Sequence, residues 1–101
     1  MEKMVFVFSE AKARALGYSA QACYDAVDKL FARYGIVPVA QGVYEAPDNQ
    51  NTFTAFGVAQ RLPYDTDWFL KVIESWMSFE DGGWGDCLAV YYKVAQNNRV
   101  F

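Results

Sequence analysis

Gly35-Ile36-Val37-Pro38-Val39-Ala40-Gln41-Gly42-Val43-Tyr44-Glu45 is the stretch of this 101-residue sequence that decides the fold. Gly35 stands where a left-handed residue would end a preceding helix. The β-branched and aromatic residues that follow predict a strand. Pro38 removes one backbone donor and Gly42 allows a bend, which is typical of a strand at the edge of a sheet. We therefore predict one bent strand over residues 36–45.

Two regular segments precede this stretch. The continuous apolar run Val5-Phe6-Val7-Phe8 predicts a central strand that is covered on both faces. Ser19 is a suitable N-cap for a helix. The buried stripe of that helix is predicted from apolar residues at helical spacing, namely Cys23, Val27, Leu30, Phe31 and Tyr34. Between strand and helix, Lys12 and Arg14 are expected to lie in a short basic loop.

The pattern after the stretch is less uniform. Residues 52–62 fit both strand alternation and a helical stripe, so the pattern alone leaves the two open. A second helix is predicted to begin at Asp65 or Thr66, with Trp68, Phe69, Val72 and Ile73 on its buried side. A strand over 76–79, a glycine-rich acidic turn over 80–86, a last strand over 88–94 and a frayed tail from residue 96 complete the expectation.

Together these segments predict a single α+β domain over residues 1–101. A ferredoxin-like sandwich, with an antiparallel-rich sheet and the helices on one face, is the compact arrangement that this order favours. With 53% hydrophobic residues, the chain can build one core without disulfides. The opposite face of the sheet would need a partner, so we expect a homodimer.

Charge and composition exclude several classes of function. The net charge of −3 and the absence of a basic footprint argue against a protein that binds nucleic acid without sequence preference. The absence of histidine excludes histidine-based acid–base catalysis and histidine metal sites. Cys23 and Cys87 match no CxxC pattern. The apolar run near the start of the chain is too short for the hydrophobic part of a signal peptide or for a membrane-spanning segment. We therefore expect a cytoplasmic protein with reduced thiols and no membrane association.

Six short segments occur in a characteristic order along the chain. They are Cys23-Tyr24-Asp25, Tyr34-Gly35-Ile36, Gln41-Gly42-Val43-Tyr44, Trp68, Phe79 and Trp84-Gly85-Asp86. In this order and spacing they resemble the VapD family, small prokaryotic proteins related in fold to the small endoribonuclease-like subunit of CRISPR adaptation. The resemblance extends roughly from Met4 to Leu88. It implies a helix over residues 52–62 and the order β-α-β-α-α-β-β of a dimeric ferredoxin-like variant.

The resemblance implies a toxin-type endoribonuclease that cleaves RNA as a homodimer, with a catalytic carboxylate at the end of the first strand. That position is Glu10 when the strand is aligned from Met4, and Ser9 when it is aligned on the apolar run. Glu10 of both subunits would bind a divalent metal such as Mg²⁺ or orient water. Asp86 would be a further catalytic residue or, alternatively, a turn residue bonded to nearby backbone amides.

Three further residues are candidates for binding RNA. Tyr44 would stack on a base or pack at the dimer interface, and Lys12 and Arg14 would contact phosphate. The sequence also departs from the family, because Ala40 and Gly42 replace Gln and Ser, and residues 74–77 replace an arginine-bearing run. Two functions follow. One is an active endoribonuclease of toxin–antitoxin type, and the other is a catalytically silent module that binds a protein partner, such as an antitoxin or a related complex.

Overall fold

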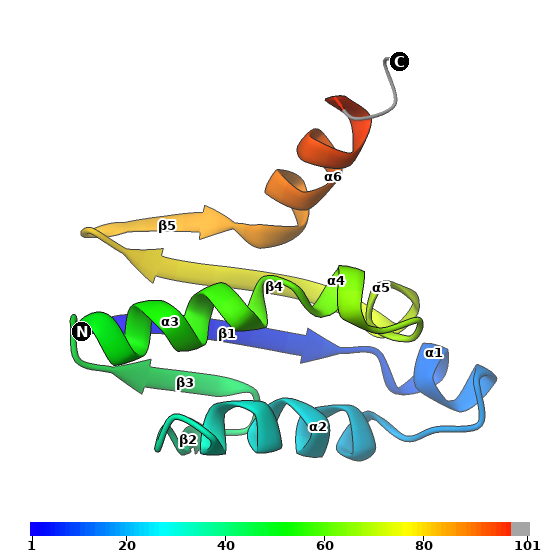
Figure 1. Cartoon of the computed structure of the whole chain (residues 1–101). Helices are drawn as coiled ribbons and strands as arrows, with labels where there is room; N and C mark the ends of the chain where they lie inside the picture. Colours follow the sequence, from blue (N-terminus) through cyan, green and yellow to red (C-terminus); the bar gives the residue numbers. More distant parts are fainter. Residues whose placement is uncertain (98–101) are drawn as a thin grey trace.

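The computed structural model describes residues 1–97 (Figure 1). In chain order its elements are β1 (Glu2–Phe8), α1 (Glu10–Ala15), α2 (Ala20–Ala32), β2 (Pro38–Ala40), β3 (Val43–Ala46), α3 (Gln50–Ala59), α4 (Leu62–Asp65), α5 (Phe69–Val72), β4 (Ile73–Glu80), β5 (Gly83–Asp86) and α6 (Cys87–Asn97). The predicted α+β class is confirmed. Within this part of the chain no helix is long and apolar enough to cross a lipid bilayer.

The five strands form one sheet in the order β2-β3-β1-β4-β5, and every neighbouring pair is antiparallel. β1 lies in the middle, where Met4 pairs with Tyr44 of β3 on one side and with Ser78 of β4 on the other. The segment containing α1 and α2 connects β1 to β2, and β3 lies between these two strands in the sheet. A strand placed between two strands that a helical segment connects is the arrangement of a split β-α-β unit. The implied element order β-α-β-α-α-β-β is not confirmed as a whole, because the hairpin β2-β3 stands in place of its second strand and α6 follows its last strand.

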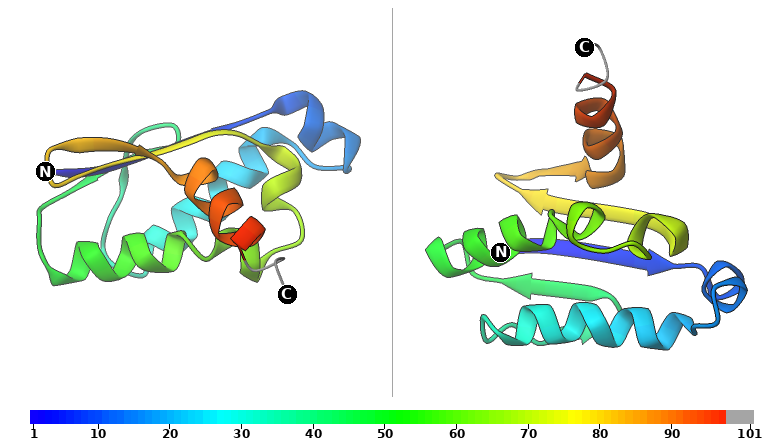
Figure 2. Two further views of the ribbon diagram at one scale, coloured as in Figure 1. Left: turned by 90° about the horizontal axis from the view of Figure 1, so that it is seen from above. Right: turned by 45° about the vertical axis from the view of Figure 1, so that its right-hand side comes forward.

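The domain has two layers, with α2, α3 and α6 on one face of the sheet (Figure 2). Its extents of 36 × 36 × 21 Å fit one sheet and one helix layer. Alternate residues of β1 divide between the faces: Met4, Phe6 and Phe8 are buried under the helices, while Val5 and Val7 lie on the uncovered face. β1 is therefore central, as predicted, but only one of its faces is covered.

Phe6 is the centre of an aromatic core. Its ring centroid lies within 6.3 Å of five other ring centroids, those of Phe8, Phe31, Tyr44, Phe69 and Trp76. These rings come from β1, α2, β3, α5 and β4. The core therefore joins the middle of the sheet to helices from both halves of the chain.

The prediction of one bent strand over residues 36–45 is wrong. The chain reverses at Gln41-Gly42, so that β2 and β3 form an antiparallel hairpin. Gly42 permits the reversal because its φ of +74° lies in the left-handed region that favours glycine. Its carbonyl accepts a hydrogen bond from the backbone N–H of Phe6 at 2.8 Å, which attaches the hairpin to β1.

The C-terminal part also differs from the prediction. The last strand expected over residues 88–94 is helix α6, and β5 lies inside the segment expected to be a turn. The turn is limited to Asp81-Gly82, whose φ values of 53° and 77° close a tight hairpin. The least exposed residues of α6 are Cys87, Leu88, Tyr91 and Ala95, which follow helical rather than alternating spacing.

The segments around these corrections are partly as expected. α2 begins after Ser19, whose Oγ accepts a hydrogen bond from the Ala22 N–H, and Gly35 has the left-handed φ expected after a helix. The helix implied over residues 52–62 is confirmed by α3 as far as Ala59.

Other segments differ in type or extent. The basic loop expected around Lys12 is helix α1, and the helix expected from Asp65 or Thr66 is the single turn α5, after which Ile73 opens β4. Of the tail predicted to fray, residues 96 and 97 belong to α6 and the rest lies outside the described residues.

Candidate functional site

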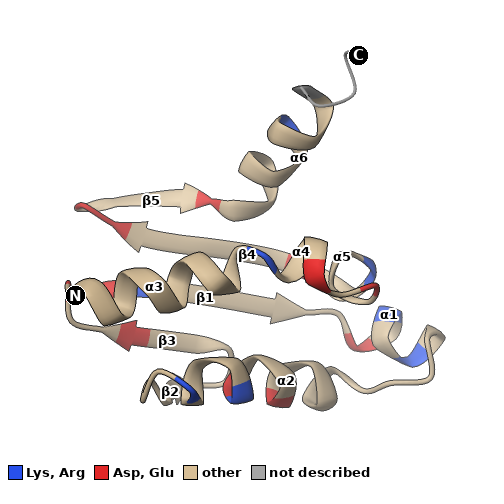
Figure 3. Cartoon of the chain, in the orientation of Figure 1, with Lys and Arg blue, Asp and Glu red and all other residues tan. Residues whose placement is uncertain are grey.

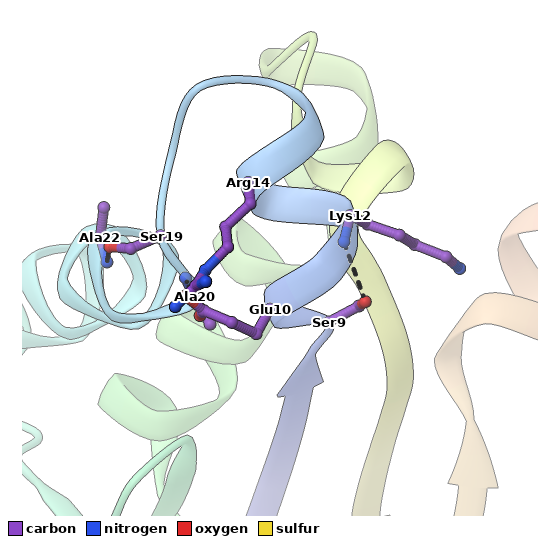
Figure 4. A network of polar contacts seen from close by, with 7 residues as sticks. All are labelled: Ser9, Glu10, Lys12, Arg14, Ser19, Ala20 and Ala22. Atoms are coloured by element: carbon purple, nitrogen blue, oxygen red, sulfur yellow. Dashed lines mark hydrogen bonds and ion pairs between the residues drawn. The ribbon is translucent and has the colours of Figure 1, made fainter.

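Ser9, one of the two residues that could stand for the family's carboxylate, lies where β1 passes into α1 (Figure 4). It is the N-cap of α1, because its Oγ accepts a hydrogen bond from the Lys12 backbone N–H at 3.1 Å. Its own N–H donates to the Val72 carbonyl at 2.8 Å. Only 8% of the residue is exposed. Ser9 therefore serves local structure and offers little surface to a substrate.

Glu10 opens α1, and both of its carboxylate oxygens are engaged. Oε2 accepts from the Ala20 N–H at 2.7 Å, and Oε1 accepts from Arg14 Nε at 2.9 Å (Figure 4). The hydrogen bond from Ala20 holds the pKa of Glu10 below its ordinary value, and Arg14 lowers it further. The carboxylate therefore joins α1 to the start of α2 and is a weak base.

The two basic candidates point in different directions. Arg14 turns toward Glu10 and pairs with it, whereas the Lys12 side chain points away from both (Figure 4). Lys12 has no ion-pair partner among residues 1–97. Ser9, Glu10, Lys12 and Arg14 thus share one short helix and its cap, where the sequence predicted a loop. Of these four residues, Lys12 alone carries a charge that is not paired within the described residues.

Tyr44 lies in the core rather than on a binding surface. It has no exposed area, and its ring stacks on Phe31 with 4.1 Å between centroids. Its hydroxyl donates a hydrogen bond to Asp28 of α2. Burial raises the pKa of Tyr44, and the bond to Asp28 raises it further, so the hydroxyl keeps its proton. No face of this ring is open to a base or to a second copy of the chain.

Tyr44→Phe is expected to lower the free energy of unfolding by about 1–2 kcal/mol, because it removes the hydroxyl partner of the half-buried Asp28 and leaves the ring stack intact. Urea unfolding at neutral pH measures the change. Tyr18→Phe is the matched control, because Tyr18 is 49% exposed. Equal stability of the two variants would show that the bond to Asp28 contributes nothing.

Asp86 lies far from α1 and from the residues that cluster on it. Its Oδ1 accepts a hydrogen bond from the Ala89 N–H at 3.0 Å, so it binds a nearby backbone amide in the first turn of α6, as the alternative prediction has it. In the sheet register Asp86 is level with Met77, which is level with Val5. Ser9 is four residues further along and two strands across, which places it roughly 15 Å from Asp86. Asp86 and Ser9 therefore do not form one site within a subunit.

The structure offers Glu10 no companions for holding a metal. Among residues 1–97, no three side chains of the kinds His, Cys, Asp and Glu come close enough together to bind an ion. Glu10 alone would supply one ligand, and both of its oxygens already accept hydrogen bonds. A metal at this position would need ligands from outside the subunit.

A groove that the sequence did not indicate lies on the helix-covered side of the sheet. Its volume is about 360 Å³. Alternate residues of β4, namely Trp76, Ser78 and Glu80, form one wall. Tyr64 of α4 and Tyr91 of α6 border it, with their ring centroids 5.2 Å apart. A volume of this size lies in the range of ligand pockets, from ~300 Å³ upward.

The groove is acidic. Burial raises the pKa of Glu80, and the carboxylates of Glu2 and Asp81 raise it further. Figure 3 shows acidic residues at the hairpin between β4 and β5 and at the end of β5. Burial also raises the pKa of the neighbouring Cys87 thiol, which favours its protonated form. Among residues 1–97 none of the residues that line the groove is basic.

Sequence reasoning missed the groove because it assigned a strand to residues 88–94. A strand there would have paired in the sheet, and the wall that α6 provides would not exist. The one available signal was the clustering of Glu80, Asp81 and Asp86, which was interpreted as a turn. Comparison with protein families and with curated proteins finds no match to the chain.

Proposed function

We propose that this chain is a VapD-like, catalytically silent protein-binding module that forms a homodimer through the uncovered face of its sheet. The observation that carries the proposal is the composition of this face. The register and the alternation of side chains assign to it the apolar residues Val5, Val7, Val43, Met77, Phe79 and Trp84. All are at least partly exposed in the single chain, and Trp84 is 55% exposed. A continuous apolar patch of this kind marks an interaction surface.

The size and shape of the face favour a second copy as the partner. The five strands are three to eight residues long. At a spacing of about 4.8 Å they cover roughly 400 Å² per copy, or about 800 Å² in a symmetric pair. This area is at the small end for a specific interface and corresponds to a weak dimer. Two sheets can stack face to face with interdigitating side chains. The charged pair on this face, Lys3 and Glu45 at 3.5 Å, neutralises itself within one chain.

The hydrogen bonds of the candidate catalytic residues support the proposal that the chain does not cleave RNA. Ser9 and Asp86 each cap a helix, and both oxygens of Glu10 accept hydrogen bonds. An RNA substrate would also meet a chain of net charge −3. The same sheet face would accept a related VapD-type chain, and such a mixed dimer would contain at most one cleavage-competent subunit. This is how a silent member would act on a related complex.

Two measurements test the proposal. Light scattering on the purified chain at micromolar concentration is expected to give twice the chain mass. A fluorogenic RNA substrate, incubated with the dimer and Mg²⁺, is expected to be cleaved no faster than by the Glu10→Gln variant. A monomer in the first experiment would remove the basis for the module, because the apolar face would then have no partner of its own kind.

An endoribonuclease of toxin–antitoxin type is the second candidate. One observation favours it: Ser9, Glu10, Lys12 and Arg14 gather at the C-terminal end of β1, where the resemblance implies the cleavage site. Lys12 would contact phosphate there, and Mg²⁺ would need ligands from both subunits and the substrate. Cleavage of RNA by the wild type that depends on Mg²⁺ and is lost in Glu10→Gln would establish this candidate and exclude the silent module.

A further inference from the structure

A second hollow lies near the groove beside α6, and Glu80 lines both. The second hollow has a volume of about 150 Å³ and lies between the start of α3 and the β4–β5 hairpin. Its acidic residues are Glu2, Asp48, Glu80 and Asp81. No basic side chain among residues 1–97 lines either hollow. The two hollows that share Glu80, together called the acidic depression, are therefore lined by acidic side chains.

Two buried side-chain atoms along this depression lack a hydrogen-bond partner among the described residues. They are Nε1 of Trp76, a residue that lines the first hollow, and Oγ1 of Thr52, a residue that lines the second. Both residues are only 1% exposed. Buried polar groups are normally paired, so an orphaned donor and an orphaned hydroxyl need an explanation. A ligand with its own carbonyl and N–H groups would satisfy both.

The carboxylate of Glu80 points to the charge of that ligand. It is half-buried, and its pKa is raised by burial and by Glu2 and Asp81. Each of these effects opposes ionisation, so the ionised group destabilises the free protein near neutral pH. A bound cation would reverse this, because an opposite charge next to a desolvated carboxylate stabilises it. Residues that reduce stability in a hollow are typical of binding sites.

We propose that this depression binds a basic peptide segment of a partner protein, with an arginine or lysine side chain placed against Glu80. The rings of Tyr64 and Tyr91, which border the first hollow and are at least partly exposed, suit a guanidinium or ammonium group, which is attracted to ring faces. The peptide backbone provides acceptors for Trp76 and both donors and acceptors for Thr52. This site lies on the opposite side of the sheet from the dimer face, so it does not depend on the homodimer.

Other ligands of the same size fit less well. Phosphate-bearing ligands, RNA included, would be repelled by the carboxylates around Glu80. A divalent ion would need three or more converging ligands, which residues 1–97 do not provide. A peptide is favoured over a free amine because a ligand longer than one side chain is needed to reach both hollows that Glu80 lines.

The test uses a fluorescein-labelled decapeptide in which arginine alternates with glycine. A second peptide has citrulline in place of each arginine, which keeps the shape and removes the charge. Fluorescence anisotropy with the full-length chain is expected to show binding of the arginine peptide that weakens with salt, and affinity for the citrulline peptide lower by about tenfold or more. Equal binding of the two peptides, or no binding of either, would overturn the proposal.

Glu80→Gln tests the residue itself. It is expected to weaken binding of the arginine peptide about tenfold. Glu74→Gln is the matched control, because Glu74 is an exposed carboxylate on the same strand that lines neither hollow. It should leave the affinity unchanged. If both variants lose affinity equally, the peptide is held by general charge attraction and the site is not at Glu80.

A stability measurement separates lost binding from lost structure. The pKa of the Glu80 carboxyl is raised in the folded state. Its contribution to folding stability is therefore fully present at a pH below the pKa of the unfolded state, and it is lost as the pH rises through the pKa of the folded state. Glu80→Gln, which resembles the protonated form, should therefore have a higher Tm than the wild type at pH 7, and the difference should shrink toward pH 4. The groups around Glu80 that titrate or carry charge are Glu2 of β1, Asp48 before α3, Asp81 of the turn, Asp86 of β5 and Cys87 of α6. A lower Tm at pH 7 would contradict the destabilising role on which the inference depends.

Discussion

Gly42→Ala is expected to lower the free energy of unfolding by about 4 kcal/mol, which is enough to unfold many small domains. A Cβ at this position would lie 2.3 Å from the Phe6 carbonyl oxygen and 2.7 Å from Cε1 of Tyr24. The carbonyl belongs to the central strand and cannot move without disturbing the sheet. The φ of +74° adds a penalty of about 1–2 kcal/mol for any residue with a side chain.

Gly35→Ala separates the two effects. Gly35 has a similar φ of +71°, but a Cβ there would meet no atom within 4 Å. It is therefore expected to cost only about 1 kcal/mol, the conformational part alone. Urea unfolding of both variants, followed by circular dichroism, gives the difference. Similar losses for the two would mean that the hairpin can move away from β1 at little cost.

Gly42 also shows what the sequence could and could not predict. The stretch identifies Gly42 as a special backbone position, but a bend and a full reversal of the chain both need a residue with positive φ. The choice between them is made by contacts far along the sequence, namely the bond from the Phe6 N–H and the side chain of Tyr24. Local pattern therefore predicted the residue correctly and the topology wrongly.

Elements that depend on local signals were predicted best. α2 has a cap at Ser19, a buried stripe and a left-handed Gly35, all within one segment. α6 is the opposite case, because apolar residues occur on most of its positions and a strand was predicted there. Its hydrogen-bonded cap at Asp86 was anticipated only as a turn contact.

The sequence named the candidate site residues, but it could not predict their hydrogen-bond partners or their burial. Ser9 and Glu10 follow directly after β1, which ends at Phe8, but the groups that they contact could not be predicted from their spacing in the sequence. The Ala20 N–H that holds Glu10 belongs to a helix ten residues further on. Tyr44 was expected to stack on a base or to pack at the dimer interface, whereas the register places it opposite Met4 and its ring stacks on Phe31 of α2. Burial is a property of the assembled fold, so sequence could not assign it.

Val5→Glu is expected to raise the dissociation constant of the homodimer by about 100-fold or more. Val5 lies in the middle of the uncovered face, between Val43 on β3 and Met77 on β4. In a symmetric dimer the substitution introduces two carboxylates, one per subunit, into an apolar interface. Analytical ultracentrifugation over a range of concentrations measures the change. A dimer as tight as that of the wild type would show that the chains pair elsewhere.

Val37→Glu is the matched control, because Val37 is 70% exposed and lies before the hairpin, outside the sheet. It should leave the dimer unchanged, so any effect common to both variants reflects added negative charge. The Val5→Glu monomer also separates the two proposals. Because the acidic depression lies on the other side of the sheet, the monomer should still bind the arginine peptide with wild-type affinity. Loss of peptide binding together with the dimer would instead mean that the peptide needs both subunits, and that the depression within one chain is not the complete site.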